Sequence, residues 1–295
     1  MAAIADLTSA DLIGQYRRRT LSPVEVIADT LDRIEAARAF NAFVVVDRDN
    51  AIAAAQESEK RWQRGMPVGR ADGVPITVKD NIWVRGLPAL KGSKTADPSP
   101  LSEDAPSVAR LREEGAIILG KTTMPEYGWI GACHSPLTGI TCNPWNPERT
   151  TGGSTGGGAV TALLNLGTMH LGTDGAGSLR IPAAFTGVFG MKPTYGLVPA
   201  YPASPFNVLA HQGPIARTVA DAALTLSIIS GPDLQDMTAW NCPATDFVGD
   251  LERGVRGLRI AWSPRLGTVR ALDPEIESAA RQAEEALARQ GEILE

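Results

Sequence analysis

One lysine and two serines are the residues of this chain whose types and settings are best suited to chemistry. Lys79 follows a short apolar run, Ser154 lies in the glycine-rich segment 152–158, and Ser178 lies in a second one, 174–180. Serine is a weak nucleophile that needs a base, and lysine can be that base once burial has removed its proton. Because glycine runs let backbone N–H groups converge on an anion, the pattern predicts a hydrolytic proton relay beside an anion site.

The same segments resemble the amidase signature family, whose members hydrolyse or transfer carboxamide groups through a Ser–Ser–Lys triad. The resemblance runs through nearly all of the chain, and so many matches in one order argue against coincidence. It is carried by residues 73–81, 120–126, 143–147, 152–158, 172–182, 192–196 and 213–221.

The resemblance implies a role for each of these residues. Ser178 would be the nucleophile, Lys79 the base, and Ser154 the middle serine, joined to Gly153 by a cis peptide bond. No cofactor is implied. The backbone N–H groups expected to form the oxyanion hole are those of Gly175, Ala176, Gly177 and Ser178.

Two positions depart from the usual family pattern, and neither removes a group of the triad. Thr155 stands where a second serine is common, and Ala176 stands where glycine is common. The extra methyl of threonine and the Cβ of alanine could each trim the substrate pocket.

Two shorter motifs suggest other enzymes. Residues 115–122 match the phosphate-loop pattern G-x-x-x-x-G-K-[ST], but the apolar run between the glycines should itself form a strand. Residues 152–156 match the G-x-S-x-G nucleophile elbow, but the preceding stretch 146–151 is polar and contains proline, so it cannot be a central strand. We therefore expect neither site, and we expect Asp174, Arg180 and Asp221 to hold loops through charge-assisted hydrogen bonds.

Composition narrows the class of protein. A chain of 295 residues with 43% hydrophobic residues can bury a substantial core, and its net charge of −5 gives no footprint for nucleic acid or an anionic membrane. The start of the chain lacks a signal-peptide pattern and no apolar stretch approaches about 20 residues, which predicts a cytoplasmic protein.

The cysteines and histidines show no metal-ligand spacing, so reduced thiols and no metal are expected. Cys133 and His134 are adjacent, but neighbours in a strand point apart, and a structural pair is favoured over a nucleophile with its base. The residues concerned are Cys133, Cys142, Cys242, His134, His170 and His211.

The alternation of apolar patterns predicts an α/β fold with a mixed central sheet covered by helices on both faces. Strands are expected at residues 42–46, 74–78, 116–119, 169–171 and 258–262. Helices are expected at residues 22–38, 50–63, 107–114, 157–166, 182–188, 220–230 and 274–290. A long irregular stretch should run through Arg149, and residues 293–294 should begin a further strand.

A single domain is expected over residues 1–295, with an N-terminal helical region (1–65), a catalytic core (66–230) and the start of a C-terminal part (231–295). Because family members are usually much longer, the chain should lack the rest of that part. The predicted partner is a small amide, with a homodimer left open. An amidotransferase subunit that frees ammonia for a partner enzyme, and an inactive fragment or pseudoenzyme, remain the alternatives to an amidase.

Overall fold

The computed structural model describes residues 3–243, 245–249, 251–290 and 292–294, and the chain divides into two compact units, Met1–Phe247 and Val248–Glu295. The central strands of the first unit are β1 (Phe43–Val46), β2 (Pro75–Lys79), β3 (Ile117–Thr122), β8 (Met169–Asp174), β9 (Phe189–Gly190) and β10 (His211–Ala216). The helices of this unit are α1 (Ser9–Arg18), α2 (Pro23–Ala36), α3 (Arg48–Arg64), α4 (Pro106–Glu113), α5 (Gly156–Leu163), α6 (Arg180–Thr186) and α7 (Val219–Ile229).

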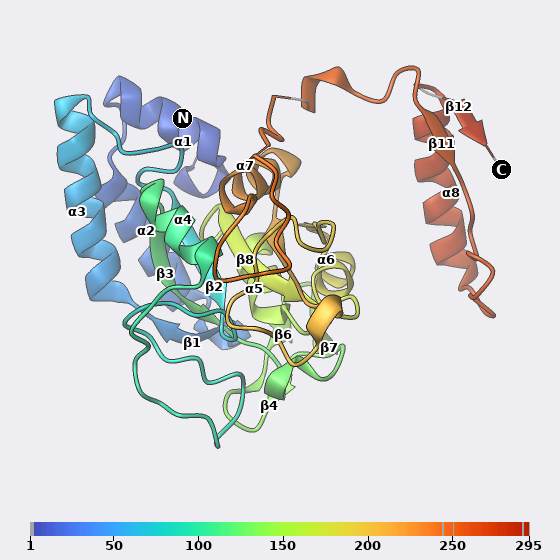
Figure 1. The fold of residues 1–295 in the computed structure, drawn as a ribbon, viewed down its shortest axis with the longest axis horizontal. Coiled ribbons are helices and arrows are strands. Elements are labelled where there is room, and N and C mark those ends of the chain that lie inside the picture. Colours follow the sequence, from blue (N-terminus) through green and yellow to red (C-terminus); the bar gives the residue numbers. More distant parts are fainter. Residues whose placement is uncertain (1–2, 244, 250, 291, 295) are drawn as a thin grey trace. The chain divides into compact units, whose positions relative to one another are not determined.

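The central strands form one mixed sheet in the order β1-β3-β2-β8-β10-β9 (Figure 1). Strand β2 runs parallel to β3 and β8, whereas β1 and β10 run antiparallel to their neighbours. Parallel strands bring their carboxyl ends to one edge of a sheet. Lys79 at the end of β2 and Asp174 at the end of β8 therefore lie at the same edge.

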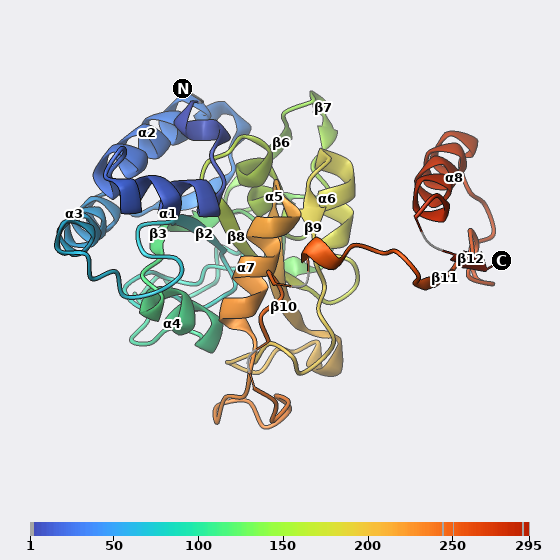
Figure 2. The same cartoon turned by 90° about the horizontal axis from the view of Figure 1, so that it is seen from above.

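Helices cover both faces of the sheet, as the sequence predicts. Leu31 of α2 shares an apolar cluster with Leu119 of β3, and Leu111 of α4 and Leu226 of α7 share another with Ile118. Successive strand residues point to opposite faces, so these clusters lie on opposite sides of β3. Figure 2 shows α2 and α4 on the two sides of β2 and β3.

The start of α2 follows from a local sequence signal. Ser22 Oγ accepts the Glu25 N–H at 3.2 Å, and the Glu25 carboxylate accepts the Ser22 N–H at 2.8 Å. This capping box satisfies two backbone donors that the helix itself cannot pair, with Pro23 at the first helical position. The predicted helix start is confirmed.

Strand β3 continues beyond the predicted residues 116–119 and takes in Gly120 and Lys121. Gly120 has a φ of 151°, and a Cβ there would lie 2.0 Å from the carbonyl oxygen of Val45. Only glycine fits this close approach of β1. The glycine that suggests a strand end in the sequence therefore allows the strand to continue.

Strand β10 is absent from the sequence prediction because it contains Gly213 and Pro214, residues that are rare inside strands. Pro214 is tolerated because β9 pairs only with Ile215 and Ala216, so the side of the strand at Pro214 is nearly an edge. Its carbonyl oxygen still accepts the Met191 N–H at 3.0 Å.

The stretch expected to be irregular contains two small ribbons outside the central sheet. Their strands are β4 (His134–Ser135) with β5 (Gly139–Ile140), and β6 (Cys142–Asn143) with β7 (Asn146–Thr150). The strand before Ser154 is thus β7 of an exposed ribbon. A nucleophile elbow at Ser154 is excluded, because that motif requires a strand of the main sheet.

The second unit is a parallel β-α-β arrangement. Strand β11 (Arg259–Ala261) is followed by α8 (Pro274–Ala288) and β12 (Glu292–Leu294), and β11 pairs with β12. Asp273 caps α8 by accepting the Glu275 N–H at 2.8 Å. The predicted strand at residues 293–294 is confirmed. The expected divisions after residues 65 and 230 stay predictions. The boundary between the two compact units lies after Phe247.

Within the described residues, no helix is both long enough and apolar enough to span a bilayer.

Candidate active site

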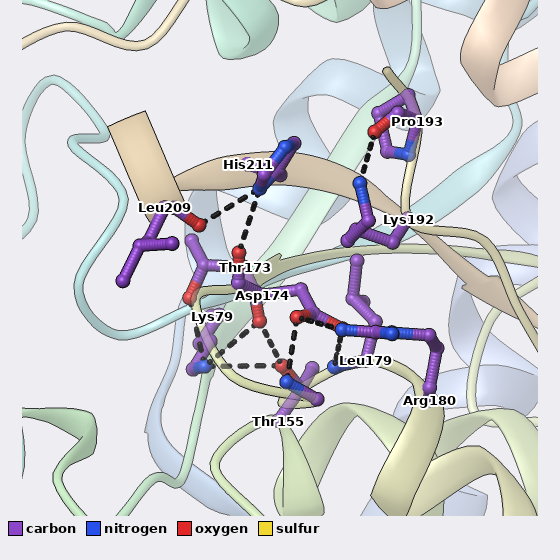
Figure 3. A network of polar contacts seen from close by, with 11 residues as sticks. Lys79, Thr155, Thr173, Asp174, Leu179, Arg180, Lys192, Pro193, Leu209 and His211 are labelled. Carbon is purple, nitrogen blue, oxygen red and sulfur yellow. Dashed lines mark hydrogen bonds and ion pairs between the residues drawn. The ribbon is translucent and has the colours of Figure 1, made fainter. Parts of the chain in front are cut away.

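Lys79 is the last residue of β2, and its side chain is completely buried. Its Nζ lies 2.8 Å from Ser154 Oγ, 3.0 Å from Thr155 Oγ1 and 2.8 Å from Thr173 Oγ1. Figure 3 shows Lys79 reaching Thr155 and Thr173 from the end of its strand. The amine is therefore surrounded by hydroxyl groups, one of which belongs to the predicted middle serine.

Burial lowers the pKa of Lys79 to about 7, against weaker opposing effects of Cys133 and Asp174. No carboxylate of the described residues lies within ion-pair distance of its Nζ. A charged amine without a counter-ion is costly in a buried position. Near neutral pH a large fraction of Lys79 is therefore unprotonated and able to accept a proton.

Ser154 lies in the loop between β7 and α5, and the Gly153–Ser154 peptide bond is cis, as the resemblance implied. Neighbouring backbone approaches this loop closely. A Cβ on Gly153 would lie 2.7 Å from the carbonyl oxygen of Ala132, and a Cβ on Gly128 would lie 3.1 Å from Ser154 Oγ. Glycine at both positions lets the neighbouring backbone pack closely around Ser154, whose hydroxyl stays within hydrogen-bond distance of Lys79.

Ser178 lies between β8 and α6 and is half-buried. Its carbonyl oxygen accepts the Thr155 N–H at 3.1 Å, so the two serine loops are joined through their backbones. Among the described residues, its hydroxyl makes no hydrogen bond. Ser154 Oγ is hydrogen-bonded to Lys79 Nζ, and within the described residues no hydrogen bond joins it to Ser178 Oγ.

Asp174 organises the loop that carries Ser178 (Figure 3). Its carboxylate accepts the N–H groups of Gly177 at 2.7 Å and Leu179 at 3.0 Å, and it pairs with both Nε and Nη2 of Arg180. Burial alone would raise the pKa of Asp174, but the hydrogen bonds from Arg180 and the two N–H groups lower it to about 2. The structural role expected for this pair is confirmed. Asp221, likewise, accepts the Ser9 N–H and thereby ties α1 to α7.

The predicted oxyanion donors are not equivalent. The Gly177 N–H is already donated to Asp174, so it does not fit the role the sequence suggested. The N–H groups of Gly175, Ala176 and Ser178 make no hydrogen bond within the described part of the chain. These three are the donors available to a substrate oxygen.

Three polar residues around Lys79 are site residues that the sequence alone does not mark. Thr155 stands out there only as a departure from the family pattern, and Thr173 and Asn81 do not stand out at all. Thr155 Oγ1 donates to the Thr173 carbonyl at 3.1 Å, and Asn81 Nδ2 donates to Thr173 Oγ1 at 3.2 Å.

Thr155 is expected to position Lys79, which can be tested with two substitutions. Thr155→Val keeps the shape but removes an acceptor at 3.0 Å from Nζ, and should lower kcat/KM by about 5-fold to 10-fold, the worth of one hydrogen bond. Thr155→Ser keeps the hydroxyl and should stay within about 2-fold of the parent. Steady-state kinetics with thermal melting of both variants checks this, and equal kcat/KM for valine and parent would remove Thr155 from the site.

Lys121, the lysine of the phosphate-loop pattern, is buried in β3 rather than exposed in a loop. Its Nζ donates to the carbonyl oxygens of Asp80 at 3.0 Å, Ile82 at 2.8 Å and Pro88 at 3.3 Å. Burial lowers its pKa to about 8. This lysine fastens the segment that follows Lys79 and has no access to a phosphate, so the predicted strand is confirmed.

Cys133 and His134 do not form a pair. Cys133 is buried with its Sγ against the hydroxyls of Thr123 and Thr141, burial raises the pKa of its thiol, and His134 is exposed. The three cysteines are not joined by disulfides. His170 is buried against the hydroxyls of Thr77 and Thr161, and burial lowers its pKa to about 3. It is a neutral core residue.

Comparison with known proteins places this site in context. The chain is 39% identical over 272 residues to an acylamidase of Rhodococcus erythropolis, covering 92% of this chain and 57% of that protein. It is 40% identical over 279 residues to a glutamyl-tRNA(Gln) amidotransferase subunit from Anaeromyxobacter dehalogenans, covering 94% and 56%. The chain thus spans little more than half the length of these relatives.

Solved structures show the same fold. A peptide amidase from Stenotrophomonas maltophilia matches with a TM-score of 0.89 and 31% identity, over 98% of this chain and 61% of that one. A bacterial aryl acylamidase of the amidase signature family matches with a TM-score of 0.89 and 30% identity, over 98% and 60%. The family model described as Amidase matches residues 25–295. The chain therefore belongs to the amidase signature family.

Proposed function

We propose that this chain carries the catalytic centre of an amidase that cleaves a carboxamide C–N bond through an acyl-enzyme. Ser178 is the nucleophile, Ser154 passes the proton, and Lys79 accepts it. The observation that carries the proposal is the 2.8 Å contact between Lys79 Nζ and Ser154 Oγ in a buried setting that lowers the pKa of Lys79 to about 7. An unprotonated amine at that distance from a hydroxyl is a competent general base.

The proposed reaction has two stages, acylation of Ser178 and hydrolysis of the acyl-enzyme. Ser178 Oγ bonds to the carbonyl carbon as its proton moves to Ser154 and the Ser154 proton moves to Lys79. The carbonyl oxygen becomes an oxyanion that the N–H groups of Gly175, Ala176 and Ser178 can stabilise. The C–N bond then breaks, and the relay returns the proton to the leaving nitrogen. Water attacks the acyl-enzyme by the same route and releases the acid.

A panel of simple amides tests the activity. The chain should release ammonia or amine from at least one small carboxamide, with the matching acid formed in equal amount. An equal yield of both products shows that the acyl group is released to water. Absence of turnover on the whole panel, together with absence of covalent labelling by an acylating inhibitor, would favour the inactive fragment.

The pH profile should follow the protonation of Lys79. The base works only when unprotonated, and its pKa of about 7 lies below that of a free lysine, about 10.4. The value of kcat/KM should therefore fall by about 10-fold for each pH unit below about 7 and level off above it. A profile without an inflection between about pH 6 and pH 8 would contradict the assignment of Lys79 as the base.

The amidotransferase subunit remains the second candidate, because a relative that is 40% identical carries that name. In that function the same triad would free ammonia from glutamine or asparagine for a partner enzyme. A stable partner that copurifies with the chain and raises its glutaminase rate would favour the subunit, whereas a free chain or homodimer with full activity would favour the amidase.

A further inference from the structure

Trp129 and Phe206 form an aromatic pair at the surface of the first unit. Their ring centroids lie 6.0 Å apart with an angle of 25° between the planes, which is a stacked arrangement. Phe206 is half-buried, but Trp129 is 78% exposed. A tryptophan with so much of its ring in water is unusual for a residue that serves only the core. One partner anchors the pair, and the other presents a flat apolar face.

Each residue of the aromatic pair lies on a segment that approaches one of the two serine loops. Trp129 directly follows Gly128, whose Cβ position lies 3.1 Å from Ser154 Oγ. Phe206 lies against the other loop, since its Cγ is 3.7 Å from the Cβ position of Gly175. The Phe206 ring therefore lies beside a proposed oxyanion donor, and Trp129 directly follows the residue that packs against the proposed proton relay.

Both segments are held in place by hydrogen bonds. The Tyr127 N–H donates to the Lys91 carbonyl at 2.8 Å, which fixes the backbone before Trp129. His211 Nδ1 lies 2.8 Å from the carbonyl oxygen of Leu209 and 3.2 Å from that of Asp174, next to Gly175 (Figure 3). The segment that follows Phe206 thus contacts the start of the loop that carries Ser178, and the segment before Trp129 is held by the Lys91 backbone.

We infer that Trp129 and Phe206 bind an aromatic ring of the amide substrate, which makes aryl-substituted amides the substrate class of this site. The inference rests on the proposed function for the location of the scissile bond. A planar ring can stack on the exposed face of Trp129. Further apolar side chains are exposed on the same two segments and extend the surface: Ile130, Val208 and Leu209.

Two pairs of substrates test the inference on either side of the amide bond. Phenylacetamide against butyramide places the ring on the acyl side, and acetanilide against N-propylacetamide places it on the amine side. In at least one pair the parent chain should prefer the aromatic member. Trp129→Leu should lower that preference, measured as the ratio of the two kcat/KM values, by about 10-fold, as expected for loss of a stacked ring pair.

Matched variants separate stacking from general damage. Trp129→Phe keeps an aromatic face and should retain most of the preference. Trp145→Leu is the control, because Trp145 is 71% exposed but has no ring partner among the described residues. The inference is overturned if the parent prefers the aliphatic member in both pairs, or if Trp129→Leu and Trp145→Leu change the preference equally.

A binding measurement keeps the inference independent of catalysis. Acetophenone is a ketone that the site cannot hydrolyse, and saturation-transfer NMR should detect its ring on the parent chain and on Ser178→Ala, but not on Trp129→Leu. If no amide is hydrolysed while this Trp129-dependent contact remains, the proposed function fails and the aromatic site stands. If amides are hydrolysed and acetophenone binds equally with or without Trp129, the aromatic site fails alone.

Discussion

Replacing Ser178 with alanine should abolish acyl-enzyme formation and with it amide turnover. Ser178 carries the hydroxyl that is proposed to attack the substrate, and the hydroxyl of Ser154 is engaged with Lys79 at 2.8 Å. No other nucleophile is proposed for the attack position. Mass spectrometry of the chain after treatment with an acylating inhibitor should show one adduct on the parent, mapped to Ser178, and none on Ser178→Ala.

The control for this experiment is Ser102→Ala, which changes an exposed serine outside both glycine-rich loops. It should be labelled like the parent. An adduct that persists on Ser178→Ala, or one that maps to Ser154, would overturn the assignment and move the nucleophile to the other loop.

Replacing Lys79 should lower kcat by about 10²-fold to 10⁴-fold, the usual contribution of a positioned general base. Lys79→Met is the preferred variant, because Lys79 is completely buried and a side chain of similar length fills the space. The charge that burial penalises disappears with the amine, so the fold should remain intact. Turnover measured beside circular dichroism and thermal melting checks both statements.

Lys60→Met is a suitable control, since Lys60 is an exposed lysine on α3 whose one ion pair among the described residues is with Glu57. It should leave kcat unchanged. Turnover of Lys79→Met near that of the parent would end the proposal of a Ser–Ser–Lys relay, whatever the labelling of Ser178 shows.

The segments that form the candidate site could be predicted from the sequence, whereas the hydrogen bonds within the site could not. Lys79, Ser154 and Ser178 stand in glycine-rich or strand-end settings that point to chemistry by their residue types. The contacts of Thr173 depend on β2 and β8 being neighbours in the sheet, which no local pattern records. The use of the Gly177 N–H by Asp174 depends on the turn of one loop. The sequence therefore indicates candidate residues for the site, but not which of their atoms are already hydrogen-bonded to other groups.

The fold shows the same division between local and tertiary causes. The mixed sheet, its covering helices and the cap at Ser22 follow from periodicity and capping residues. Strand β10 could not be predicted because Pro214, which has no N–H to donate, opposes strand formation locally. It is tolerated because the pairing with β9 covers Ile215 and Ala216 and does not extend to Pro214. Strand β3 is longer than predicted because glycine is usually unfavourable inside a strand. At Gly120 it is required, since a Cβ there would collide with the carbonyl oxygen of Val45.

Substitutions at Trp129 and Phe206 should alter the proposed substrate surface without displacing the proposed proton relay, because Lys79, Ser154 and Ser178 lie on other segments of the chain. Lys79 ends β2, Ser154 lies between β7 and α5, and Ser178 follows β8, and the hydrogen bond from the Thr155 N–H to the Ser178 carbonyl joins the two serine loops. The side chains of Trp129 and Phe206 project from connecting segments outside the central sheet. Libraries that vary these two positions should therefore yield new substrate selectivities while the proposed triad is preserved.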